Sequence, residues 1–265
     1  MNDGVLEGYV NWLGNVVRGD FGDSWFYGVP VTQKFGDVIW YSVVLNIITI
    51  FLEILICIPL GIQAARNQYG KFDYGIMIFA MLCISLPTFF LATVLKYIFA
   101  IKLNWFDLYG IVGRYYDQLS GWGKCLDMAK HMFLPVLTLC MLNIGSLTRY
   151  TRTNMLEVLN ADYIRTARAK GLSEKVVINR HAFRNTLIPL VSYLSYLVPS
   201  LFSGSMITET LYQIPGIGYI SYDAMVAGDL PFTMFYSVFG LVLTQVSLML
   251  ADIMYAVVDP RVRVN

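Results

Sequence analysis

The sequence is poor in charge and in the residue patterns of soluble enzymes. Only 14% of its 265 residues are charged, 57% are hydrophobic, and the net charge is +1. This composition lies outside the soluble globular range and predicts a membrane protein with no general attraction to nucleic acid. The four cysteines and two histidines form no CxxC pair and no Cys/His cluster, so neither a disulfide framework nor a metal site is expected.

The motifs of ATP binding and of hydrolysis are also missing. The chain has no GxxxxGK[ST] phosphate loop, no HExxH and no GxSxG. We therefore expect no catalytic residue and no cofactor in this chain, and energy from ATP would have to come from a partner chain. The N-terminus lacks the basic, apolar and small-residue order of a signal peptide.

Five apolar runs have lengths that suit the crossing of a bilayer. They occupy residues 40–65, 74–100, 131–147, 187–207 and 232–258. The predicted fold class is therefore all-α, a polytopic membrane helix bundle with five transmembrane helices within residues 40–258. An N-terminal segment of residues 1–39 precedes this domain, and a tail of residues 259–265 follows it.

The positive-inside rule orients these spans. Basic residues exceed acidic ones in the link at 66–71, in the loop at 149–186 and in the tail at 259–265, which we place in the cytoplasm. Alternation then places three segments outside: residues 1–39, 101–130 and 208–231. An odd number of spans with a cytoplasmic C-terminus would require the polar N-terminal segment to cross unaided, so we expect an upstream span in the functional protein.

The longest basic stretch, residues 160–185, lies between the third and fourth runs and predicts a short helix at a membrane surface. Asn160 is a good N-cap, and Gly171 stands where a left-handed C-cap would end the helix. Ile164, Ala167 and Gly171 share a small, smooth face beside a basic edge, which favours docking into a groove of another protein. The alternative is a helix lying on lipid, but the face lacks the Trp, Phe or Leu anchors of such helices.

Polar residues inside the spans are the candidates for a translocation pathway. Glu53 lies in the middle of the first span, where pathway lining and a structural hydrogen bond are both open. Gln245 and Asp252 share a face of the last span, and a structural role is favoured for Asp252 near the cytoplasmic end. The fourth span is the most polar and adds five candidates: Ser192, Ser195, Tyr196, Ser200 and Ser203. Close packing through small residues is their alternative role. Lys96, near the end of the second span, is expected to reach the lipid headgroups.

The stretch YIRTARAKGL at residues 163–172, followed by Val177, His181, Arg184 and Asn185, resembles the cytoplasmic signature of ABC-importer permeases in the dipeptide, oligopeptide and nickel branch. Other landmarks of that family match in order: GDFGDS at 19–24, IPLGIQAA at 58–65, SLPTFF at 85–90, TETLYQIPGIG at 208–218, GDLP at 228–231 and DPRVR at 259–263. The broader EAA-xxx-G importer pattern is matched only in part, because Arg-Thr-Ala stands where Glu-Ala-Ala would and the glycine is kept.

The resemblance implies a six-helix permease core, of which this chain lacks the first helix. It also implies an assembly in the cytoplasmic membrane with a second permease subunit, expected to form a heterodimer, two ATP-binding-cassette ATPase subunits that bind the ATP, and an extracytoplasmic substrate-binding protein. The residues that it assigns to coupling with the ATPase are Tyr163, Ile164, Arg165, Thr166, Ala167, Arg168, Ala169, Lys170, Gly171 and Leu172.

The expected function is translocation of di- or oligopeptides, with nickel or another small solute as the alternative substrate of the same family. A competing class is an ion-coupled secondary transporter that uses Glu53 and Asp252, which would predict inverted repeats that the sequence does not display. A membrane-embedded enzyme would require a catalytic cluster, and the sequence carries none of the motifs named above.

Overall fold

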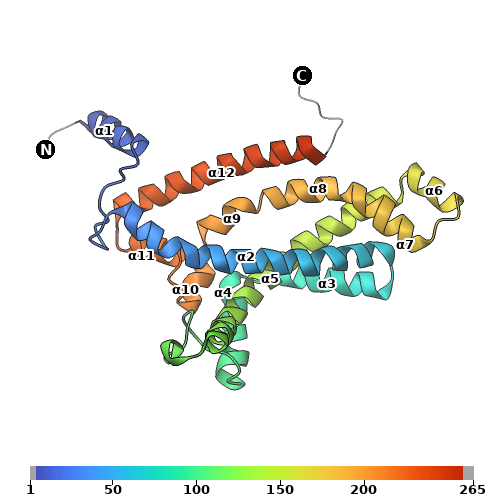
Figure 1. Cartoon of the computed structure of the whole chain (residues 1–265), viewed down its shortest axis with the longest axis horizontal. Coiled ribbons are helices and arrows are strands. Elements are labelled where there is room, and N and C mark those ends of the chain that lie inside the picture. The colour runs from blue at the N-terminus through green and yellow to red at the C-terminus, as the bar shows by residue number, and fades with distance from the viewer. Residues whose placement is uncertain (1–3, 259–265) are drawn as a thin grey trace.

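The computed structural model describes residues 4–258, and its elements are helices joined by turns and short loops (Figure 1). The described chain contains no β-strand, which confirms the all-α prediction. The predicted tail at 259–265 lies outside the described residues.

The helices follow one another along the chain with the following bounds. They are α1 (Val5–Val17), α2 (Val31–Arg66), α3 (Lys71–Ser85), α4 (Thr88–Leu95), the π-helix η1 (Lys96–Lys102), the 3-10 turn η2 (Tyr116–Gln118), α5 (Gly121–Leu159), α6 (Asp162–Ala169), α7 (Glu174–Val176), the π-helix η3 (Val177–Ala182), α8 (Phe183–Ser195), α9 (Val198–Ser203), α10 (Met206–Tyr212), α11 (Ile217–Val226) and α12 (Leu230–Val258).

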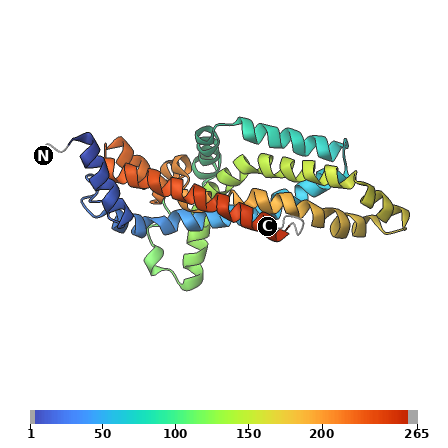
Figure 2. The same cartoon turned by 90° about the horizontal axis from the view of Figure 1, so that it is seen from above.

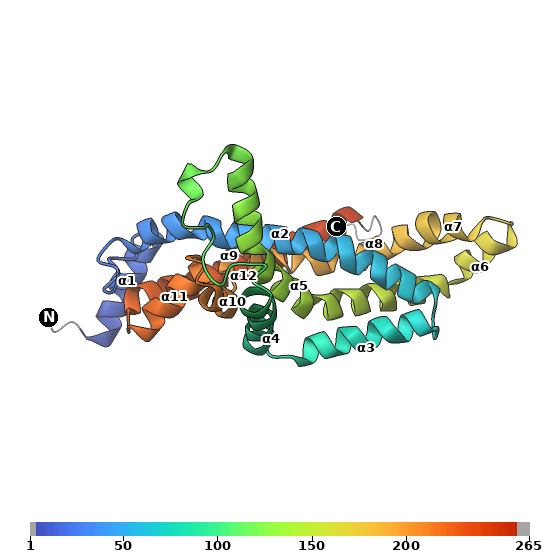
Figure 3. The same ribbon diagram turned by 90° about the horizontal axis from the view of Figure 1, so that it is seen from below.

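The long apolar helices are those expected from the sequence. Four are long and apolar enough to cross a membrane: Val31–Arg66, Gly121–Leu159, Glu174–Ser203 and Leu230–Met254. The bent pair Lys71–Ser85 and Thr88–Lys102 supplies a fifth if it is counted as one span. The molecule is elongated, with α2 running along much of its length (Figures 1 and 3). The link between α2 and α3 lies at the same end as α6, and α1 and α11 lie at the opposite end.

The second span is not the single straight helix that we expected over residues 74–100. Its two halves are bent by 104° at a short break. Pro87 lies in that break, and Leu86 before it is extended, with ψ at 129°. A proline disfavours the helical conformation of the residue that precedes it, so the chain leaves α3 here and restarts as α4.

Two glycines allow the helix backbones to approach closely. A Cβ atom on Gly61 of α2 would lie 2.6 Å from the Cβ of Thr151 on α5. A Cβ on Gly145 of α5 would lie 2.4 Å from the carbonyl oxygen of Ala80 on α3. Because association within a bilayer depends on close packing, these two contacts fix α5 between α2 and α3.

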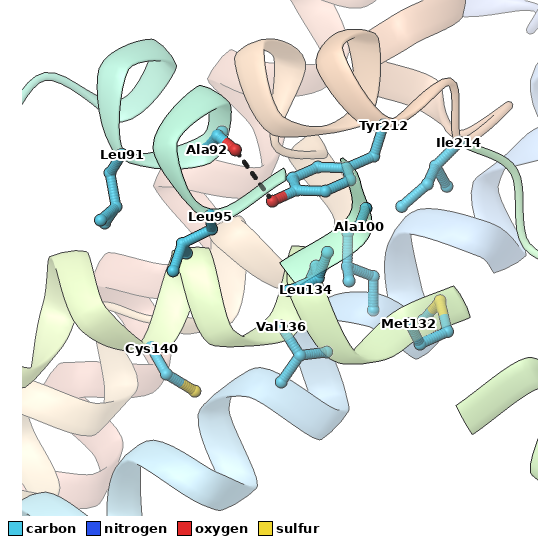
Figure 4. Packing of buried hydrophobic residues seen from close by; sticks show 11 residues of the cluster. Leu91, Ala92, Leu95, Ala100, Met132, Leu134, Val136, Cys140, Tyr212 and Ile214 are labelled. Atoms are coloured by element: carbon cyan, nitrogen blue, oxygen red, sulfur yellow. Dashed lines mark hydrogen bonds between the residues drawn. The ribbon is translucent and has the colours of Figure 1, made fainter. Parts of the chain in front are cut away.

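The largest apolar cluster joins α2, α4, α5 and α10 (Figure 4). Tyr212 is almost fully buried in it, and its hydroxyl lies 2.9 Å from the Thr138 Oγ1 and 3.5 Å from the carbonyl oxygen of Ala92. Lys96 also points into the protein, since its Nζ donates to the carbonyl oxygen of Leu211 at 2.6 Å. The expectation that Lys96 reaches the lipid headgroups is therefore wrong, because α10 folds back over the end of α4 and offers a carbonyl acceptor.

Candidate coupling loop and translocation pathway

The central basic stretch forms a short helix, α6, at the far end of the bundle (Figures 1 and 2). Gly171 follows it with a φ of 75°, which confirms the predicted left-handed C-cap. The predicted N-cap is wrong. Asn160 ends α5, where its side chain donates to the carbonyl oxygen of Leu156 at 2.9 Å, and Ala161 takes the N-cap position of α6.

The face of α6 that we expected to dock into another protein faces this chain instead. Ile164 is fully buried and Ala167 is 6% exposed. They pack in a cluster with Ala65 at the end of α2, Met155 of α5 and residues of η3, including Val177. The docking prediction for this face is therefore wrong, because the ends of α2 and α5 and the start of the fourth span cover it. Helical spacing shows which side chains share a face but not what that face contacts.

The opposite face of the loop is open. Eight of the ten predicted coupling residues are exposed: Tyr163, Arg165, Thr166, Arg168, Ala169, Lys170, Gly171 and Leu172. This set contains three cations, and only Arg165 and Arg168 have acidic partners among the described residues. A surface of this kind suits contact with another protein through charge and a single aromatic ring rather than through an apolar ridge.

An ion pair ties α6 to the start of the next helix. The guanidinium of Arg168 donates twice to the carboxylate of Glu174, with Nη2 to Oε1 at 2.8 Å and Nε to Oε2 at 3.2 Å. These hydrogen bonds raise the pKa of Arg168 above its ordinary value. Both side chains are nearly half exposed, so the pair contributes about 1 kcal/mol or less. Its main effect is to fix the turn between α6 and α7.

A second ion pair, which the sequence did not reveal, joins the first turn of α3 to the C-terminal part of α5. Arg152 donates to Asp73 with Nε to Oδ1 at 2.5 Å and Nη2 to Oδ2 at 2.6 Å. Asp73 is 2% exposed and also accepts from the backbone N–H of Tyr69 at 3.0 Å. The two residues are 79 positions apart, a separation that no sequence spacing connects.

The candidate pathway residues do not form a single cluster. Glu53 is 2% exposed, and its Oε1 accepts a hydrogen bond from Asn143 Nδ2 of α5 at 2.7 Å. The carbonyl oxygen of Ser195 accepts from Ser247 Oγ of α12 at 2.8 Å, which matches the close-packing alternative for that serine. The hydroxyls of Ser192, Ser195 and Ser200 donate to carbonyl oxygens of their own helical segment.

The remaining candidates have different environments. The carbonyl oxygen of Ser203 accepts from the Tyr236 hydroxyl at 2.6 Å. Tyr196, Gln245 and Asp252 are exposed. A pathway role for Glu53 and for these residues stays a prediction.

The predicted external loop carries a buried carboxylate, Glu209, that joins three helices. Its oxygens accept from the Ser42 hydroxyl of α2 and from the backbone N–H groups of Ser205, Gly218 and Tyr219, at 2.8 to 3.2 Å. Burial raises the pKa of Glu209, and these four donors oppose that shift. A Cβ atom on Gly216 would lie 2.5 Å from Glu209 Oε2, so the small residues of TETLYQIPGIG are needed for this fit.

Asp229, just before α12, anchors the N-terminal segment. Its carboxylate accepts from the Ser24 hydroxyl and from the backbone N–H groups of Phe26 and Phe232, the latter two at 3.2 Å. Burial acts to raise the pKa of Asp229, but these hydrogen bonds outweigh it and the net shift is downward. The GDFGDS and GDLP motifs therefore contact each other through Ser24 and Asp229.

Four or five apolar spans, with a basic loop folded onto one end of the bundle, define a multi-pass membrane protein. Residues 57–264 match the family described as binding-protein-dependent transport system inner membrane component, and the chain belongs to this family. It is thus a membrane-embedded component of an ABC importer, a transport component rather than an enzyme, in a family that works with ATPase and substrate-binding partners.

Curated oligopeptide permeases are similar in sequence to this chain over almost its whole length. It is 36% identical over 263 residues to the oligopeptide transport system permease protein AppB of Bacillus subtilis, covering 99% of this chain and 82% of AppB. It is 34% identical over 264 residues to OppB of Escherichia coli, with the same coverage. A chain of the inward-facing MetNI methionine ABC transporter shares the fold, with a TM-score of 0.67, 14% identity and coverage of 86% of this chain and 97% of that one.

Proposed function

We propose that this chain is the permease subunit through which di- or oligopeptides cross the cytoplasmic membrane, with its C-terminus in the cytoplasm. The observation that carries the proposal is the similarity to oligopeptide permeases over 99% of the chain. The substrate would arrive from a binding protein at the end of the bundle that carries Glu209 and Asp229. A second, different permease subunit would complete the pathway, and two ATPase subunits would bind the ATP.

The exposed face of the coupling loop is the surface that we assign to the ATPase. Its buried face, with Ile164 against Ala65 and Met155, connects it to the ends of α2 and α5. A displacement of α6 by an ATPase would therefore reach two spans directly. This division differs from the one expected from the sequence: the exposed residues make the contact, and the small, smooth face carries the motion inward.

Transport by the whole complex is the first test. Proteoliposomes would contain this chain, its partner permease, both ATPases and the binding protein, and uptake of a labelled oligopeptide would be measured with and without ATP. ATP-dependent uptake is expected. Uptake driven by a proton gradient without ATP would return the chain to the secondary-transporter class, and uptake of Ni²⁺ in place of peptide would overturn the substrate assignment.

A matched pair of variants tests the coupling surface. Thr166→Trp adds bulk on the exposed face of α6, and Gln118→Trp adds the same bulk on an exposed residue of the predicted external loop. We expect Thr166→Trp to abolish peptide-stimulated ATP hydrolysis or to release the ATPases on purification, and Gln118→Trp to leave both unchanged. Normal coupling in Thr166→Trp would show that this face does not meet the ATPase.

A further inference from the structure

A cavity of about 390 Å³ opens between α5 and α8. Six side chains line it: Ser146, Arg149, Tyr150, Thr153, Asn154 and Tyr193. Every one of them carries a polar group, and four of the six (Arg149, Tyr150, Thr153 and Asn154) lie in the part of α5 that follows the predicted span at 131–147 and is expected on the cytoplasmic side.

The cavity is part of a polar stripe along α5. Asn143, Ser146, Tyr150 and Thr153 recur at intervals of three and four residues, so they share one face of the helix. The opposite face of α5 carries the buried residues that pack on α2 and α3. Asn143, which binds the buried Glu53, extends the stripe beyond the cavity. Asn143 and Thr153 of this stripe are exposed, and Ser146 and Tyr150 are half-buried, so part of the polar face stays open to the cavity.

Arg149 is the only charged residue in the cavity lining. It is exposed, and among residues 4–258 no ion pair includes it. Arg152, one turn further on, is by contrast held by Asp73. An arginine without an acidic partner, surrounded by hydroxyl and amide groups, creates a local positive potential that attracts an anionic group.

The aromatic wall of the cavity is fixed in place. The rings of Tyr150 and Tyr193 stack with their centroids 4.8 Å apart, and the Tyr150 hydroxyl donates to the carbonyl oxygen of Pro189 at 3.2 Å. The cavity thus combines a cation, hydrogen-bonding groups and a flat apolar surface. The C-terminal end of a peptide has a matching group for each of them: a carboxylate, amide groups and a side chain.

We propose that this cavity binds the C-terminal carboxylate of a peptide during its passage. Arg149 would hold the carboxylate through paired hydrogen bonds, Ser146, Thr153 and Asn154 would bind the last peptide groups, and the stacked tyrosines would contact the last side chain. Because every unmodified peptide ends in a carboxylate whatever its sequence, such a site suits a carrier of many peptides. The proposal rests on the peptide-permease function above, and a lipid phosphate is the other anion that could occupy the cavity.

Protection of a cysteine in the cavity tests the proposal. Cys125 is the exposed cysteine of the native chain and is first replaced by serine. Ser146→Cys is then introduced, and the full complex is placed in nanodiscs of zwitterionic lipid. Alkylation of the new thiol is followed with increasing amounts of one peptide, either with a free C-terminus or as its C-terminal amide. We expect the free acid to protect at a concentration about tenfold or more below that of the amide.

Two variants test whether the guanidinium of Arg149 causes the difference in protection between the free acid and the amide. Arg149→Gln should remove the difference between acid and amide, and Arg149→Lys should keep part of it because the charge remains. Arg149 makes no ion pair among the described residues, so neither change should prevent folding, and thermal unfolding of each variant checks this.

Three results would overturn the proposal. They are equal protection by acid and amide, a preserved difference in Arg149→Gln, and protection by added phosphatidylglycerol but by neither peptide, which would identify a lipid site. ATP-dependent peptide uptake by the native complex distinguishes a failure of the cavity assignment from a failure of the proposed function. Uptake without selective protection refutes only this cavity assignment, and absence of peptide uptake refutes the proposed function itself.

Discussion

Truncation of one buried side chain should loosen the coupling loop without touching its exposed surface. Ile164 is fully buried in the cluster that joins α6 to the ends of α2 and α5. Ile164→Ala removes packed methyl and methylene groups and leaves a cavity, at a cost of about 2–5 kcal/mol. For comparison, the exposed Arg168–Glu174 pair contributes about 1 kcal/mol or less, so the buried contact dominates the stability of the loop.

Hydrogen exchange of the backbone amides in residues 162–182 measures this effect. Local opening should become easier in Ile164→Ala, and protection of these amides should fall by about 25-fold or more. Thr166→Ala is the matched control on the exposed face. It loses a hydrogen bond of 3.0 Å to the carbonyl oxygen of Asp162 and should change the free energy of opening by about 0.5 kcal/mol or less. Equal protection in the native chain and in Ile164→Ala would refute the packing that we describe.

Three further predictions concern other parts of the chain. Gly61→Ala should lower the melting temperature of the purified protein because its Cβ has no space against α5, and Gly240→Ala, with open space around it, should not. Because the pKa of Asp229 is lowered in the folded state, its stabilisation of the N-terminal segment is present at neutral pH and should be lost as the pH falls below about 4, seen as faster proteolysis near Ser24. A cysteine at Tyr222, 40% exposed, should react with an impermeant thiol reagent on intact cells, and one at Ser221, 1% exposed, should not.

Each of these has a clear contrary result. Equal melting temperatures for the two glycine variants would contradict the close approach of α2 and α5. Asp229→Asn should proteolyse at neutral pH as the native chain does in acid, and identical pH profiles for the two proteins would exclude Asp229 as the titrating group. Labelling of the Tyr222 cysteine only after permeabilisation would reverse the predicted topology, with Cys125 replaced in all cases.

The spans could be predicted because length and hydropathy alone decide whether a helix can cross a bilayer. The interruption within the second span was harder to foresee. Pro59 and Pro135 lie inside continuous helices, and Pro87 lies at a bend of 104°. The same residue type thus had two outcomes. The presence of a proline in an apolar run therefore does not by itself tell whether the helix continues or breaks.

The short helix of the basic loop and its glycine cap were located correctly along the chain, but the contacts of its small face were not. Composition placed a helix and its glycine cap, since both depend on local conformation. The small face of α6 packs against the ends of α2 and α5 and against η3. The spacing of residues within 160–185 does not tell which segments cover that face. The contacts of Glu209 and Asp229 were missed for the same reason. Their donors come from segments as distant as Ser42 and Ser24.

The same two helices connect the coupling loop to the predicted outer end of the bundle. At one end Ile164 packs with Ala65 of α2 and Met155 of α5. Toward the other end α2 supplies Ser42 to the carboxylate of Glu209, and α5 packs against α10 in the central cluster. Because α2 and α5 pack closely between these points, we expect them to move together. On the proposed coupling, a push on α6 therefore reaches the Glu209 contact as a shift of the α2 and α5 pair. A larger residue at Gly61 should interrupt that transmission even where the loop and the outer contact remain folded.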